Sequence, residues 1–157
     1  MTFLRFVFAM FLSFLPGFLG VLVAPTETGG NLWYNTLNHS MLTPPGWVFS
    51  VAWTILYFLI GLALFFVMQT HDEYHNKNSA YVLFAVNIIL NTLWSFAFFG
   101  AELPSVALLI LTALIVVVLF MAREFYRINH MSFWFLVPYI LWLFFAFYLN
   151  GTIVYLN

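Results

Sequence analysis

Long apolar stretches separated by short polar breaks run the length of this chain. A membrane-spanning helix needs about 20 apolar residues to cross roughly 30 Å of hydrocarbon. Five stretches meet that requirement. Hydrophobicity within each stretch is continuous rather than alternating, which favours α-helices over the strands of a membrane β-barrel. The predicted spans cover about residues 3–24, 45–69, 80–100, 104–123 and 131–155.

Proline positions refine these spans. Pro16 and Gly17 lie in the middle of the first one and predict a kink there. Pro45 and Pro104 open the second and fourth spans, where proline costs no helical hydrogen bond. The first span is too long for a signal peptide and has no clear cleavage site of small residues. We therefore interpret it as a membrane span.

Composition agrees with a lipid environment. The chain has 157 residues, of which 65% are hydrophobic and 6% are charged. Nine charged side chains cannot cover a soluble domain of this size with a polar surface. We predict an all-α integral membrane protein, a bundle of five transmembrane helices that forms one domain over residues 1–157. Net charge is −1, so nothing indicates nucleic-acid binding, and the chain has no cysteine.

The basic residues predict an orientation. With five spans, Arg5, Lys77, Arg123 and Arg127 all fall on the same side of the membrane as the N-terminus. The positive-inside rule then places the N-terminus in the cytoplasm and the C-terminus outside. We expect a multi-pass membrane protein in this orientation.

Several functional classes find little support. No acidic or basic residue lies deep within a span, which argues against a proton-coupled transporter or a voltage sensor. His71 and His75 have the spacing of two metal ligands, but no third ligand lies nearby in the sequence, so we predict no metal site. Hydrolase and phosphate-loop motifs are absent from the sequence. We nominate no catalytic residue.

Uncharged polar residues and aromatic residues recur at helical spacing. Asn87, Asn91 and Ser95 form one stripe on the third span, with Trp94 close to the same face. On the second span, Trp53 and Tyr57 lie one turn apart on the same face. On the fifth span the face consists of Tyr139, Trp142, Ala146 and Leu149.

Two interpretations of these faces stay open. Aromatic surface with a few hydrogen-bonding groups suits a pocket for a large, flat, mostly apolar ligand. Asparagine and serine within a membrane also commonly join one helix to another, at about 1 kcal/mol or less per contact. Spacing by itself does not separate the two.

Three motifs in chain order resemble the TspO/translocator-protein family. The first comprises residues 33–37 (WYNTL), 43–49 (TPPGWVF) and 52–57 (AWTILY). The second comprises residues 91–95 (NTLWS) and 98–100 (FFG). The third is PYILW at 138–142, followed by Ala146 and the Leu149-Asn150 pair. Together they cover essentially the whole chain, with the spacing intact.

The resemblance implies a five-helix bundle, usually a homodimer, with a pocket beneath the long first loop. In that loop we expect Asn31 to cap a short helix, and Trp33 and Tyr34 match the family's lid. The positions that match the family's pocket are Trp53, Tyr57, Asn91, Trp94, Trp142 and Ala146. Tyr139 joins them from the face described above. The resemblance thereby favours the pocket interpretation.

The implied function is a receptor or transporter-like protein that binds tetrapyrroles such as protoporphyrin IX or haem-related molecules, or drug-like apolar ligands, without a required cofactor. The alternatives are light-dependent porphyrin degradation, with Trp53 and Trp142 beside the ligand, and a regulatory scaffold without turnover. The resemblance, to a bacterial member of the family, implies the bacterial cytoplasmic membrane as the location, with the outer membrane as the alternative. Gly151 follows Asn150 and no basic residue comes after it, which predicts weak sterol binding.

Overall fold

The structure is a computed structural model that describes residues 2–23, 32–70 and 77–157. Five long helices are apolar enough to cross a membrane. A five-residue helix precedes the second of them, and a π-helical turn extends the third. The elements are α1 (Thr2–Gly20), α2 (Leu32–Thr36), α3 (Gly46–Gln69), α4 (Asn78–Ser95), η1 (Phe96–Gly100), α5 (Pro104–Ile128) and α6 (His130–Leu156). No strand occurs in the described ranges, so the predicted all-α membrane fold is confirmed.

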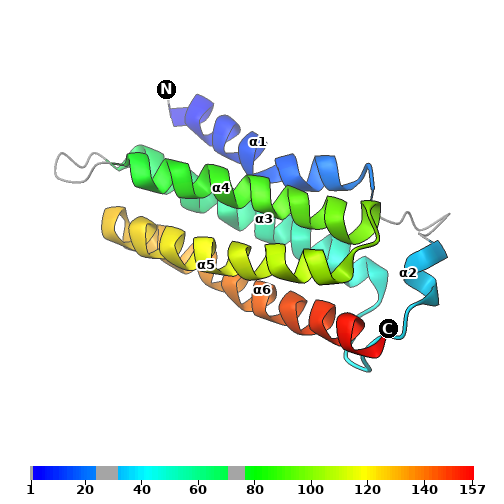
Figure 1. The fold of residues 1–157 in the computed structure, drawn as a ribbon. Helices are drawn as coiled ribbons and strands as arrows, with labels where there is room; N and C mark the ends of the chain where they lie inside the picture. The colour runs from blue at the N-terminus through cyan, green and yellow to red at the C-terminus, as the bar shows by residue number, and fades with distance from the viewer. Residues whose placement is uncertain (1, 24–31, 71–76) are drawn as a thin grey trace.

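The five long helices form a closed ring of neighbours. α1 packs on α3, α3 on α6, α6 on α5, α5 on α4, and α4 returns to α1. The two termini lie at opposite ends of the bundle (Figure 1). We call the end where α1 and α4 begin the basic end. The end where α2 lies beside the C-terminus is the lid end.

Helix boundaries differ from the prediction most clearly in α5. The predicted fourth span stops near residue 123, whereas α5 continues to Ile128 and α6 begins at His130. The polar residues between them therefore extend the helices beyond the apolar stretch. Glu124 and Arg127 are one turn apart, with 3.4 Å between carboxylate and guanidinium atoms. Asn129 interrupts the helix, and its side-chain oxygen accepts a hydrogen bond from the Met131 amide at 2.9 Å.

Close helix contact explains the glycines of α1 and α3. A Cβ atom at Gly61 would lie 2.7 Å from the Ser13 hydroxyl, and one at Gly17 would lie 2.7 Å from the Tyr57 ring. Small residues allow membrane helices to approach in this way. α1 continues through Pro16 and changes direction along its length (Figure 1), in line with the predicted kink.

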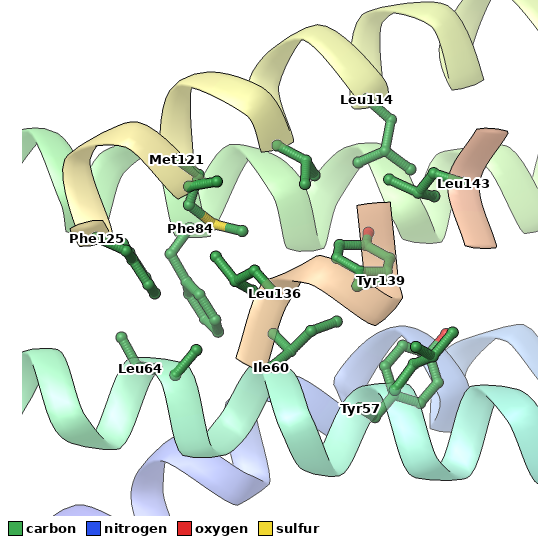
Figure 2. Close-up of a cluster of buried hydrophobic side chains, with 14 of the residues drawn as sticks. Tyr57, Ile60, Leu64, Phe84, Leu114, Met121, Phe125, Leu136, Tyr139 and Leu143 are labelled. Atoms are coloured by element: carbon green, nitrogen blue, oxygen red, sulfur yellow. The ribbon is translucent and has the colours of Figure 1, made fainter. Parts of the chain in front are cut away.

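The core lies where α3, α4, α5 and α6 converge (Figure 2). Its large side chains interdigitate from all four helices. Those labelled in the figure are Tyr57, Ile60, Leu64, Phe84, Leu114, Met121, Phe125, Leu136, Tyr139 and Leu143. The two tyrosines place hydroxyl groups inside this otherwise apolar core, and these hydroxyls begin the candidate site.

The basic end concentrates positive charge on the C-terminus of α3. Arg5 donates from Nη1 to the Met68 carbonyl at 3.1 Å. Lys77 donates from Nζ to the Val67 carbonyl at 2.9 Å and also to the Thr70 carbonyl. Cations at a helix C-terminus satisfy its unpaired carbonyls and complement its dipole. Arg123 and Arg127 lie at the same end, near the last turn of α5.

Candidate ligand-binding site

Four of the predicted pocket residues form one aromatic group, which we call the inner cluster: Trp53, Tyr57, Tyr139 and Trp142. The Trp53 ring stacks on Tyr57 with centroids 5.3 Å apart. It meets Tyr139 edge-on at 6.3 Å and Trp142 edge-on at 6.5 Å. Such stacked and edge-to-face pairs are favoured by the charge distribution of aromatic rings. Helical spacing on α3 and α6 therefore brought these residues together as predicted.

A buried hydrogen-bond chain connects this cluster to α4. The Tyr57 hydroxyl donates to Asn91 Oδ1 at 3.2 Å, and Asn91 Nδ2 donates to the Tyr139 hydroxyl at 3.0 Å. That hydroxyl in turn donates to Asn87 Oδ1 at 2.8 Å. This series of hydrogen bonds joins α3, α4 and α6, and both asparagines are almost fully buried. In this structure Asn87 and Asn91 thus act as contacts between helices, and a role in ligand binding stays a prediction.

The indole nitrogen of Trp142 is buried and has no hydrogen-bond partner in the described residues. A buried N–H without a partner costs free energy, especially where no bulk water can reach it. A bound molecule would reach this donor after a movement of the Trp142 side chain, because the nitrogen is buried in the observed conformation.

A shallow apolar groove of about 410 Å³ runs beside Trp142, between α3 and α6. Its lining side chains are aliphatic or aromatic, and the buried indole nitrogen of Trp142 is the one polar side-chain atom among these residues. The lining residues are Ala52, Ile55, Leu56, Pro138, Leu141, Trp142 and Phe145. Ala146 does not line the groove; it is buried in the core, one turn from Trp142. The groove opens at the apolar surface of the bundle.

The remaining predicted residues lie in a second aromatic group, the lid cluster: Trp33, Tyr34, Trp94, Phe98 and Phe99. Trp94 stacks on Phe98 at 5.4 Å, and Phe98 meets Trp33 at 5.8 Å. Tyr34 contacts Phe98 at 6.2 Å and Phe99 at 5.8 Å. The π-helical turn η1 carries both phenylalanines. Turns of this kind re-aim side chains within an α-helix, so period-3.6 reasoning did not identify Phe98 or Phe99 as lid partners.

Trp94 is held by Asn150, which the periodicity analysis did not select. The Trp94 indole donates to Asn150 Oδ1 at 3.1 Å, and Asn150 Nδ2 donates to the Pro104 carbonyl at 2.9 Å. This amide therefore joins α4, α5 and α6. Its spacing offered a signal, since Asn150 lies one turn beyond Ala146 on α6.

The chain after α2 is tied to the end of α6. The Asn38 amide donates to Asn157 Oδ1 at 2.9 Å, and the hydroxyls of Ser40 and Tyr148 lie 3.0 Å apart. His39 Nε2 lies 3.0 Å from the Tyr34 carbonyl oxygen. Burial raises the pKa of the Tyr34 phenol above its usual value. These contacts between distant segments have no pattern in the sequence.

The metal and capping predictions lie elsewhere. His71, His75 and Asn31 fall outside the described residues. Within the part of the chain that the structure describes, no group of three or more potential ligands could hold a metal ion. A side chain at Gly151 would meet no neighbour within 4 Å, so the weak sterol binding expected from this position can be tested by substitution.

Comparison with known proteins gives the family. The model of the TspO/MBR family matches residues 8–156, which includes both aromatic clusters and the polar chain between them. The chain belongs to the TspO/MBR family. The predicted family resemblance is thereby confirmed.

Three relatives show how far the similarity extends. The tryptophan-rich protein TspO of Chlorobaculum tepidum is 36% identical over 90% of this chain and 88% of its own length. The protein of the same name from Archaeoglobus fulgidus is 33% identical over 100% and 99%. The tryptophan-rich sensory protein of Cereibacter sphaeroides is 35% identical over 95% and 92%. The chain is therefore an integral, multi-pass membrane protein of the TspO/MBR family, similar to these relatives along nearly its whole length.

Proposed function

We propose that this protein is a membrane receptor for planar tetrapyrroles of the porphyrin type, which bind beside Trp142 between α3 and α6. The observation that carries the proposal is Trp142, which lines an apolar groove and whose buried N–H has no hydrogen-bond acceptor among the described residues. A porphyrin offers an apolar ring together with carboxylate oxygens. It can therefore satisfy both features of this site.

The inner cluster suits a flat ligand. Trp142 lines the groove, so a ring entering the groove meets this indole; Trp53 packs against Trp142 at an interplanar angle of 82° without lining the groove. Aromatic pairs contribute about 0.5–1.5 kcal/mol beyond burial. The groove volume of about 410 Å³ lies within the range of small-molecule sites, roughly 300–1,000 Å³. Its mouth opens at the apolar surface, so we infer that ligand enters from the lipid.

Titration of the purified protein with protoporphyrin IX in detergent tests the proposal. We expect saturable quenching of tryptophan fluorescence at one porphyrin per chain. Free N-acetyltryptophanamide at the same indole concentration is the control for absorption of light by porphyrin. Linear, non-saturating quenching equal to this control would refute the proposal.

A second candidate function is light-dependent porphyrin oxidation by dioxygen. It is favoured by the Trp53–Trp142 pair, whose ring centroids are 6.5 Å apart and which would hold the porphyrin beside it; dioxygen is the oxidant and takes up the electrons that the illuminated porphyrin loses. Under illumination, the bound porphyrin would then change its spectrum faster than free porphyrin in detergent. Equal rates for the wild type and the Trp53→Phe/Trp142→Phe double variant would remove this candidate.

Location and assembly are part of the same proposal. The four basic residues gather at one end of the bundle, so we infer that the basic end faces the cytoplasm and the lid end faces outward. An alkaline phosphatase fused to the C-terminus should be active, and one fused at residue 77 should be inactive. The reverse pattern would overturn this orientation. On the family resemblance we also expect a homodimer.

A further inference from the structure

A second groove lies between α1, α3 and α4, in the half of the bundle next to the basic end. Its volume is about 550 Å³. Phe8 and Leu12 of α1 form one wall, Met68 of α3 forms another, and Tyr81 and Ala85 of α4 form the third. None of its lining residues belongs to the inner cluster or the lid cluster. The two grooves therefore belong to separate parts of the bundle.

The shape of this groove matches one lipid chain. Its lining on α4 extends from Tyr81 to Ile89, a length of about 12 Å at a rise of 1.5 Å per residue. One leaflet contributes about 15 Å, half of the hydrocarbon core. The N-terminal half of α1 slopes away from α4 in Figure 1. An acyl chain lying along the helices would fill the groove over most of one leaflet.

A cation marks the end of the groove nearest the membrane surface. Arg5 precedes Phe8 and Leu12 at i−3 and i−7, so it shares their face of α1. Its Nη1 donates to the carbonyl of Met68 at 3.1 Å, which fixes the guanidinium against the α3 wall. Tyr81 is the first groove residue along α4, so it lies near the same end of the groove. The groove thus has an apolar body and a cationic mouth.

The Arg5 guanidinium has hydrogen-bond donors without a partner among the described residues. A guanidinium has five N–H donors, and the bond to Met68 occupies one of them. Among the described residues, no carboxylate forms an ion pair with it; the ion pair found there joins Arg127 to Glu124. Arginine binds phosphate in a bidentate way and is less strongly hydrated than lysine. The free donors at this depth therefore fit the phosphate of a lipid headgroup.

We propose that this groove is a binding site for one anionic phospholipid, with an acyl chain between α1 and α4 and the phosphate on Arg5 and the Tyr81 hydroxyl. Charge complementarity favours a lipid over a second copy of the chain. A symmetric interface repeats the same patch on both partners, so a second copy docked here would bring another arginine toward Arg5 instead of an anion. The site is independent of the porphyrin proposal.

Lipid retention by the purified protein provides the test. The delipidated protein is mixed with dioleoyl phosphatidylglycerol or dioleoyl phosphatidylcholine, and native mass spectrometry counts the lipids retained while thermal unfolding measures stabilisation. We expect one phosphatidylglycerol per chain, preferred about tenfold over phosphatidylcholine, as one or two charge-assisted hydrogen bonds would give. Arg5→Gln should abolish the preference, and Arg5→Lys should retain part of it.

Matched variants separate this site from a general charge or volume effect. Arg127→Gln removes the same charge at the same end, outside the groove, and should leave the preference unchanged. Ala85→Phe should fill the groove and abolish retention of both lipids, whereas Ala113→Phe, on the exposed face of α5, should not.

Three outcomes would overturn the proposal. The first is equal retention of both lipids by the wild type. The second is a folded Ala85→Phe variant that retains phosphatidylglycerol as the wild type does. In the third, the wild type retains no lipid, and the Ala85→Phe substitution converts a dimer into a monomer. A second copy of the chain would then occupy the groove of the wild type.

Discussion

Trp94 and Trp142 are the same residue type on similarly predicted helix faces, yet their surroundings differ. The Trp94 indole donates to Asn150, whose amide continues to the Pro104 carbonyl. The Trp142 indole is buried without an acceptor in the described part of the chain. Trp94 packs with the lid, and Trp142 forms a wall of the groove between α3 and α6.

The difference separates a structural from a binding role. Both indoles contribute aromatic surface, so hydrophobicity does not distinguish them. The hydrogen-bond partner does, because a satisfied N–H stabilises the bundle while an unsatisfied one costs free energy until an acceptor arrives. We therefore expect changes near Trp94 to lower stability and changes near Trp142 to lower ligand affinity.

The largest expected effect concerns Asn150. Replacing it with alanine leaves the Trp94 N–H without its acceptor and the Pro104 carbonyl without the amide donor. We expect a loss of about 2–3 kcal/mol in the free energy of unfolding, measured by thermal unfolding in detergent. Porphyrin affinity of the folded fraction should be unchanged. Thr112→Ala is the control, since that hydroxyl only contacts its own helix at 2.8 Å; a similar loss for both variants would contradict the assigned role of Asn150.

The second-largest effect should come from substitutions that change the side-chain volume at and beside Trp142. Trp142→Ala removes a groove wall, and Ala146→Leu overfills the core beside it. Each should weaken protoporphyrin binding about tenfold, or roughly 1.4 kcal/mol, by fluorescence titration. Val117→Ala on α5 should bind like the wild type. If all three variants remain folded and bind equally well, the ligand site lies elsewhere.

Replacing each indole with a phenyl ring, which removes the N–H and part of the aromatic surface, compares the two tryptophans directly. Trp94→Phe should lower stability by about 1 kcal/mol, because the Asn150 oxygen loses its donor, with little effect on porphyrin affinity. Trp142→Phe should leave stability almost unchanged and weaken binding about threefold, as the loss of one hydrogen bond predicts. Unfolding and titration of both variants under one condition provide the measurement. An exchange of the two phenotypes would invert the roles assigned here.

The smallest effect should come from the lid. Asn157→Ala removes a tie between the chain after α2 and the end of α6, where Asn38 and Asn157 are exposed. Exposed hydrogen bonds contribute little to stability. We expect porphyrin association and dissociation rates in stopped-flow fluorescence, and the equilibrium affinity, to stay within about twofold of the wild type, because the groove opens toward the lipid and no lid residue lines it. Asn35→Ala, on the exposed side of α2, serves as the control; clearly faster association for Asn157→Ala alone would show that ligand enters beneath the lid instead.

Sequence periodicity predicted much of the candidate site. Trp53, Tyr57, Tyr139 and Trp142 share faces because residues three or four apart on a helix are neighbours, and the structure places them in contact. The same reasoning grouped Trp94 with Asn91. Their side chains in fact take different partners, since Asn91 bonds to two tyrosines and Trp94 turns toward Asn150. A helical wheel gives direction to within a face and does not identify the partner across it.

The amino-acid sequence by itself determined the five apolar helices, the all-α class, the family and the gathering of basic residues at one end. These properties depend on local composition, because lipid requires each span to satisfy its own backbone hydrogen bonds. Only the tertiary structure decided which polar groups are satisfied. The Asn150 bridge, the unpartnered Trp142 N–H and the placement of Arg5 at a groove arise from contacts between helices distant in sequence. Such contacts depend on how the helices pack and rotate against one another, which the pattern along a single helix does not specify.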